Sequence, residues 1–327
     1  MDTGQSEKLA YRPDDYPTHI SQAVVGRTDS QKMATIWGDV TSWPMGTYTI
    51  FYEGEGTLTL GGNVKSITVI SSRRITFQLA PPTGWDPVVE LVIQTSDISD
   101  PVSNIRVIMP GHETTYVEKP FNPLWLEGLR IFKSLRFMDW GETNSWNFHK
   151  RDSLPAGKVF SWADSAQIDH YTWAGGRGVP NEMMIKLMNE EGFDGWVCTP
   201  DRVDQEFMIK MATLFRDTLD PNLHLSVEFS NEIWTTMMDQ TQYLKNYGKP
   251  SQYVLDKYSS GAPGYNSIPA ITWPENITGP LEDCLRMWTE VYGSQLDRIT
   301  RIIGLQAAWQ DLSKRMAFNG EARLPWM

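Results

Sequence analysis

Residues 227–234 have the residue types and spacing best suited to chemistry, and they read Val-Glu-Phe-Ser-Asn-Glu-Ile-Trp. The first part has the pattern of a short buried strand, and Asn231 and Glu232 follow it directly. A carboxylic acid placed there can protonate the leaving oxygen of a glycoside, and a neighbouring amide can hydrogen-bond a sugar hydroxyl. Burial beside an indole such as that of Trp234 raises a carboxyl pKa by desolvation. We therefore expect Glu232 to be a general acid with Asn231 beside it; the alternative is a Glu that caps a helix and an Asn that satisfies a turn.

Three other carboxylates are candidates for a partner of Glu232. Glu228 lies four positions earlier on the same strand, roughly 13 Å away at about 3.3 Å per residue. Glycosidases hold their two carboxyl groups about 5–5.5 Å apart if retaining and about 6.5–9.5 Å apart if inverting. Glu228 is therefore expected to be a buried carboxylate paired with Arg136. Asp139 and Glu142 end another expected strand, and either could face Glu232; solvated or structural acids are the alternative.

Aromatic and amide side chains near these acids are the candidate substrate-binding groups. Trp140, Asn144 and Trp146 stand at the start of a long Trp- and Gly-rich segment, and Trp234 follows Glu232. The chain has 14 Trp, more than a core of this size requires, and flat apolar faces suit sugar rings. For each single Trp, ordinary packing is an equally compatible interpretation.

Other chemistries find no support in the sequence. Cys198 and Cys284 show no CxxC spacing, so neither a disulfide framework nor a zinc site is expected. The five His show no HxxxH or HxH spacing, and no GxGxxG, P-loop or GxSxG motif is present. We expect no metal and no cofactor.

The elements that must position these residues fall into two regions. Residues 1–30 are expected to be an extended lead-in, and residues 31–102 carry short β-rich runs separated by Gly and Pro turns, typical of a β-sandwich. From 103 to 327 strands and helices alternate, which indicates βαβ units around a parallel sheet. We expect an incomplete (β/α)8 barrel of about five parallel strands, with the carboxyl rim bearing the site; an open doubly wound sheet fits the same alternation. The expected parallel strands are 105–109, 135–140, 193–199, 223–230 and 301–308.

Asn231-Glu232, together with segments 135–140 (LRFMDW) and 195–207 (GWVCTPDRVDQEF), resembles the clan of retaining glycoside hydrolases built on (β/α)8 barrels. This clan includes the cellulase, mannanase and arabinofuranosidase families, and one bacterial branch carries a β-sandwich ahead of the barrel. The resemblance spans roughly residues 100–310. It implies that Glu232 is the acid/base at the end of the fourth strand. Clan members carry the nucleophile on the seventh strand, which we expect to be missing because our strand count stops at five.

Composition limits the partners. A net charge of −11 and a pI of about 5.0 argue against nucleic acid or an anionic membrane. No apolar run of about 18 residues is present, so no membrane span is expected. The resemblance implies an oligo- or polysaccharide substrate and a secreted or periplasmic protein, although residues 1–15 lack the apolar run expected of a signal peptide. An open barrel edge predicts that a second copy of the chain, in a homodimer, or the C-terminal tail covers it.

Three functions are open at this point. The first is a glycoside hydrolase that acts on β-linked glucan or a related plant polysaccharide. The second is a non-catalytic carbohydrate-binding protein derived from a glycosidase. The third is a structural or assembly protein.

Overall fold

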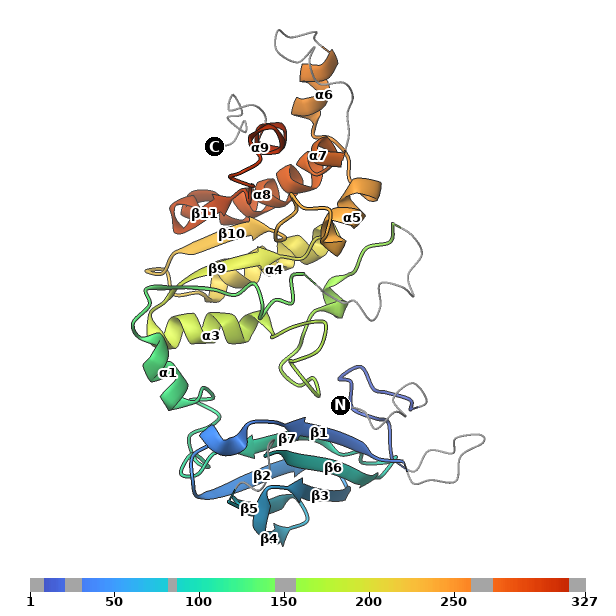
Figure 1. The fold of residues 1–327 in the computed structure, drawn as a ribbon, viewed down its shortest axis with the longest axis vertical. Helices are drawn as coiled ribbons and strands as arrows, with labels where there is room; N and C mark the ends of the chain where they lie inside the picture. The colour runs from blue at the N-terminus through green and yellow to red at the C-terminus, as the bar shows by residue number, and fades with distance from the viewer. Residues whose placement is uncertain (1–8, 21–30, 82–86, 145–156, 260–272, 318–327) are drawn as a thin grey trace. The chain divides into compact units, whose positions relative to one another are not determined.

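The computed structural model of the chain describes residues 9–20, 31–81, 87–144, 157–259 and 273–317 (Figure 1). The chain divides into two compact units. The first unit comprises Met1–Pro123 together with Asp169–Thr172, and the second comprises Leu124–Ile168 together with Trp173–Met327. Among the described residues, no helix combines the length and the apolar character that crossing a bilayer requires.

The N-terminal unit contains two antiparallel sheets. The three-stranded sheet has the order β1 (Met33–Trp37), β6 (Val89–Ser96), β3 (Gly56–Gly62). The four-stranded sheet has the order β4 (Val64–Ser71), β5 (Arg74–Leu79), β2 (Thr47–Glu53), β7 (Ser103–Ile108), and a short 3-10 helix, η2, spans Val40–Ser42.

Alternation of side chains builds the core of this unit. In β5 the residues Ile75, Phe77 and Leu79 are buried and their neighbours are less so, because successive strand side chains point to opposite faces. They share one apolar cluster with residues of the other sheet, including Val89 and Ile93. The two sheets therefore pack through a common core, which part of the expected lead-in also joins through Leu9, Tyr16 and Ile20.

The C-terminal unit is built on a four-stranded parallel sheet. Its order is β11 (Ile299–Ile302), β10 (Leu225–Phe229), β9 (Asp194–Thr199), β8 (Ser134–Arg136). Three long helices accompany it: α3 (Asn181–Glu191), α4 (Gln205–Thr218) and α8 (Thr278–Tyr292) (Figure 1). The shorter helices are α1 (Pro123–Leu129), α5 (Asp239–Tyr247), α6 (Gln252–Ser259), α7 (Trp273–Asn276), α9 (Gln310–Met316), η3 (Trp162–Asp164) and η4 (Gly293–Arg298).

One face of this sheet meets the long helices. The hydroxyl of Thr199 in β9 lies 3.5 Å from the Cys284 sulfur of α8, and Leu225 and Val227 of β10 are fully buried. Glu228 lies between Val227 and Phe229, so its side chain points to the opposite face. Strand alternation thus separates an apolar, helix-covered face from one that carries polar groups.

The fold expected from the sequence was wrong. The parallel sheet has four strands in linear order and is part of a mixed α/β fold, not a partial barrel. The expected first barrel strand, 105–109, is β7, which pairs antiparallel with β2 in the N-terminal unit and carries that unit beyond residue 102. A short apolar run reads the same in a parallel and an antiparallel strand, so the sequence pattern could not separate the two. Glu232 therefore follows the third strand of the parallel sheet, not the fourth.

Candidate functional site

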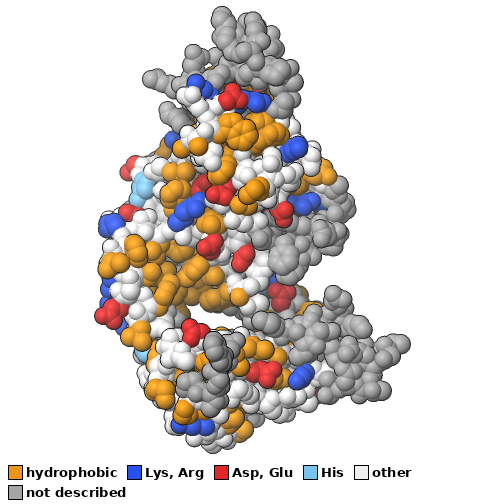
Figure 2. All heavy atoms as spheres, in the orientation of Figure 1, with side chains coloured by type: hydrophobic (Ala, Val, Ile, Leu, Met, Phe, Trp, Pro, Cys, Tyr) orange, Lys and Arg blue, Asp and Glu red, His pale blue; other side chains and the backbone are white. Residues whose placement is uncertain are grey.

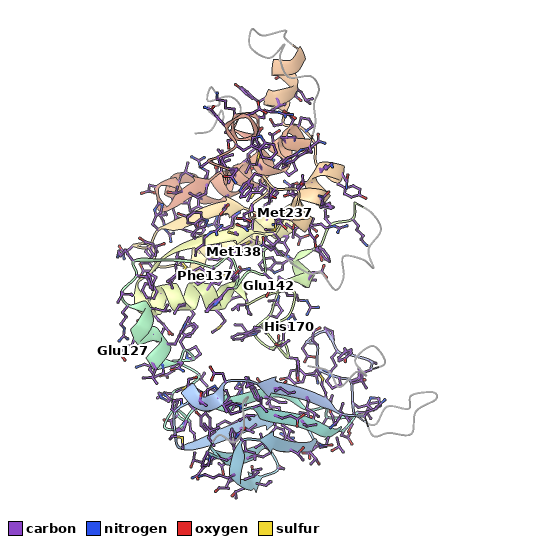
Figure 3. All side chains as sticks on the ribbon, viewed as in Figure 1. Glu127, Phe137, Met138, Glu142, His170 and Met237 are labelled. Atoms are coloured by element: carbon purple, nitrogen blue, oxygen red, sulfur yellow. The ribbon has the colours of Figure 1, made fainter. Side chains whose placement is uncertain are left out.

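The carboxyl ends of the parallel strands bring the candidate residues to one edge of the sheet. Figure 3 shows Met138 and Glu142, which follow β8, and Met237, which follows β10, along this edge. A hydrogen bond of 2.9 Å from Asn231 Nδ2 to Asn144 Oδ1 joins the two connecting segments. Because parallel strands end at the same side of a sheet, residues almost 90 positions apart in the chain become neighbours here.

Glu228 is buried and paired with Arg136, as predicted from the sequence, and two further donors also reach it. Its Oε2 accepts hydrogen bonds from Arg136 Nη2 at 2.8 Å and Trp196 Nε1 at 3.0 Å, and the Cys198 thiol lies 3.5 Å away. Burial, then the Glu228 charge, raises the pKa of Cys198 to about 12, so the thiol stays protonated and can donate. A Cβ at Gly304 would lie 2.4 Å from Glu228 Oε1, so a larger residue there would displace this carboxylate.

Asn231 is also buried, and the protein occupies both ends of its amide. Its Oδ1 accepts from Arg136 Nη2 at 2.9 Å, and its Nδ2 donates to Asn144. Asn144 Oδ1 accepts a second bond, of 2.8 Å, from Gln240 Nε2. The amide of Asn231, expected to meet a sugar hydroxyl, therefore bonds protein groups and positions the turn instead.

Glu232 differs from these neighbours. It is half-buried and has a φ of +46°, and Ser230 before it has a φ of +57°. Left-handed conformations of residues other than glycine cost roughly 1–2 kcal/mol and cluster at functional sites. Within the described ranges, no hydrogen bond or ion pair engages the Glu232 carboxylate. The turn therefore presents an unengaged carboxyl group at the edge of the sheet.

Asp139 and Glu142 form a second acidic pair at the end of β8. The backbone N–H of Glu142 donates to the Asp139 carbonyl at 3.0 Å, and Glu142 has a φ of +48°. Burial raises the pKa of Glu142, and the charge of Asp139 raises it further. Each of these effects disfavours the ionised form of Glu142. A carboxyl group that donates or accepts protons near neutral pH needs a pKa raised in this way.

The candidate aromatic residues have different environments. Trp140 is half-buried and stacks on Trp125 of α1, with ring centroids 5.8 Å apart and an interplanar angle of 15°. Trp125 is 38% exposed, and Figure 2 shows hydrophobic side chains gathered over α1 and α3. Trp234 is half-buried. Trp146 lies outside the described residues.

Gln240 is the site residue that sequence reasoning missed. It lies in the first turn of α5, is fully buried, and bonds both Asn144 and the backbone carbonyl of Asn231. An isolated Gln in a polar helix carries no sequence signal of this role. Only the packing of α5 against the turn after β10 reveals it.

Two further features bear on the site: a cavity, and the side chains that could bind a metal ion. A cavity of about 250 Å³ lies among α4, α5 and α8, lined by residues including Phe229, Tyr243 and Met287, but Glu232 is not among them. In the part of the chain that the structure describes, no group of three or more His, Cys, Asp or Glu side chains could hold a metal ion.

Comparison with protein-family models, curated proteins and solved structures finds no match for the chain.

Proposed function

We propose that the chain is a glycoside hydrolase that acts on β-linked glucan or a related plant polysaccharide, with Glu232 as general acid/base. One observation carries the proposal: the Glu232 carboxyl group is unengaged among the described residues, while the amide of Asn231 beside it and Oε2 of Glu228 earlier on the strand bond protein groups. Protein groups that only stabilise a fold are usually paired when buried. The likeness of Asn231-Glu232 to the acid/base motif of retaining glycosidases supports the same assignment.

The proposed reaction places a proton on the glycosidic oxygen. Glu232 donates this proton as the bond from the anomeric carbon to that oxygen breaks, and the bonding electron pair leaves with the oxygen. In a retaining reaction the second carboxylate bonds the anomeric carbon, water then displaces it, and Glu232 takes up the proton that the water loses. In an inverting reaction water attacks the anomeric carbon directly, and the second carboxylate takes up that proton. Asp139 and Glu142 are the candidates for the second carboxylate. The anomer released first, read by NMR, distinguishes a nucleophilic role of this carboxylate (retention) from a base role (inversion).

The test compares wild type with Glu232→Gln on aryl β-glycosides and soluble β-glucans. Loss of a general acid lowers turnover by about 100- to 10,000-fold, while the amide keeps the size of the side chain. Glu206→Gln is the matched control, because Glu206 is exposed on α4 and pairs with Lys210 at 2.7 Å. Equal sugar release by wild type and Glu232→Gln would refute the catalytic assignment.

A non-catalytic carbohydrate-binding protein is the second candidate, favoured by the Trp125–Trp140 pair. Stacked, partly exposed indoles can offer an apolar face to a sugar ring. Calorimetry with cello-oligosaccharides tests this candidate in wild type and in Trp125→Ala. Binding without hydrolysis, weakened in the variant, would favour it over an enzyme; no heat from either protein would favour a structural role.

A further inference from the structure

We propose that Gln240 is a positioning residue that sets the orientation of Glu232. The inference rests on the proposed function of Glu232 and extends it to α5, a helix with no previously assigned part in the site. Gln240 does not need to touch substrate for this role. It acts through the backbone that carries the proposed acid.

The contacts of Gln240 converge on the turn that holds Glu232. Its Nε2 donates to the Asn231 carbonyl at 2.7 Å and to Asn144 Oδ1 at 2.8 Å. The next residue, Thr241, places its hydroxyl 3.5 Å from the Glu232 carbonyl. The carbonyls on both sides of the Glu232 Cα are therefore approached by consecutive side chains of α5.

The turn needs such support because its backbone is strained. Glu232 and Ser230 both adopt left-handed φ values, which persist only when the surrounding structure imposes them. The Ser230 N–H donates to the Thr199 carbonyl at 3.0 Å, which anchors the start of the turn to β9. Gln240 holds the middle of the turn through its bond to the Asn231 carbonyl. Its bond to Asn144 connects the turn to the segment after β8, which also contains Asp139 and Glu142.

Gln240 also departs from what stability alone requires. It is fully buried, yet its Oε1 has no hydrogen-bond partner among the described residues. A buried acceptor without a partner costs free energy, and such groups in native proteins call for an explanation. Here both amide hydrogens are committed to the turn and to Asn144, which leaves the oxygen unsatisfied.

The test uses Gln240→Glu, whose effect a change of pH can reverse. At about pH 8 the new buried carboxylate faces two acceptor oxygens, so the turn is released and turnover falls by roughly 100-fold, the effect of a misplacement of about 1 Å. At about pH 5 the new carboxyl is protonated, because burial raises its pKa, and its O–H can donate again. When each variant is compared with wild type at the same pH, we expect most of the loss of turnover in Gln240→Glu to disappear at about pH 5.

Two further variants separate positioning from simple folding. Gln240→Met removes both donors at similar size, so its loss should not respond to pH. Gln242→Met is the matched control, because Gln242 is exposed and its side chain donates among the described residues only to the Thr236 carbonyl, so this variant should behave as wild type. A Gln240→Glu loss that is equal at both pH values, or no loss in either Gln240 variant, would overturn the proposal.

A second readout does not depend on hydrolysis. Carbodiimide coupling of an amine to Glu232, followed by mass spectrometry, reports the accessibility and environment of this carboxyl. The coupling yield in Gln240→Glu should differ severalfold from wild type at about pH 8 and approach it at about pH 5. If wild type hydrolyses no glycan, the proposed function fails, but this yield still decides whether Gln240 positions Glu232; an unchanged yield in both Gln240 variants would count against it.

Discussion

Two carboxylates four positions apart, Glu228 and Glu232, lie in regions of opposite character. Glu228 is 4% exposed, inside β10, and bonded by Arg136 and Trp196. Glu232 is half-buried in a left-handed turn, and no described residue engages its carboxylate. The first region has the features of a group held for structure, and the second those of a group left available. The comparison teaches that the surroundings of a carboxylate decide its role more than its place on a strand.

The largest expected effect comes from unpairing Glu228. Arg136→Met leaves a buried carboxylate without its cation and removes a donor from Asn231 Oδ1, which should lower the free energy of unfolding by about 3 kcal/mol. Urea denaturation measures it. In Lys210→Met, which breaks the exposed pair with Glu206, the change should stay below about 1 kcal/mol. Equal losses in the two variants would remove the distinction between the Glu228 region and the surface.

A smaller effect of opposite sign is expected at Glu232. Glu232→Gly relieves a left-handed strain of about 1–2 kcal/mol, against a chain-entropy cost of about 0.5–1 kcal/mol for glycine. The variant should therefore be more stable than wild type, by up to about 1.5 kcal/mol, and have no hydrolytic activity. Thermal unfolding measures the change in stability, and a glycan hydrolysis assay measures the loss of activity. A destabilised Glu232→Gly would mean that the side chain contributes to packing.

The smallest effect is a dependence on pH at Glu142. Burial and the charge of Asp139 raise its pKa in the folded state, so its ionised form is disfavoured there. The favourable contribution of the protonated form is present at pH values below the unfolded pKa of about 4.3 and is lost as pH rises through the folded pKa.

Glu142→Gln removes this penalty. Its melting temperature should exceed that of wild type slightly at about pH 7 and match it at about pH 4. Asp139→Asn should show part of the same gain, because it removes the second cause of the shift. A difference between Glu142→Gln and wild type that is the same at both pH values would show that it does not arise from ionisation.

Local elements were largely predictable from the sequence. The expected strand 193–199 is β9 (Asp194–Thr199), and the helix before it, α3 (Asn181–Glu191), ends at Gly192 with a φ of +72°. Apolar periodicity and a glycine stop act over a few residues, so the chain alone carries them. The expected strand at 301–308 was displaced, since β11 covers Ile299–Ile302.

The site was only partly predictable. The pairing of Glu228 with Arg136 was expected from opposite charges on two strands, and the structure confirms it between β10 and β8, which lie on either side of β9. The occupied amide of Asn231, the bonds of Gln240 and the stacking of Trp140 on Trp125 depend on which segments meet. No local sequence pattern predicts these contacts between segments that are far apart in the chain.

By itself, the order of residues determined the approximate positions of most strands, which strand faces are apolar, and that Asn231 and Glu232 follow a buried strand. Tertiary structure alone decided that 105–109 pairs antiparallel with β2, that four parallel strands form a linear sheet, and that Gln240 reaches the turn. The physical reason is the separation along the chain over which each kind of interaction acts. Periodicity and turn chemistry act between near neighbours, whereas strand pairing and buried hydrogen bonds depend on contacts between residues far apart in the chain.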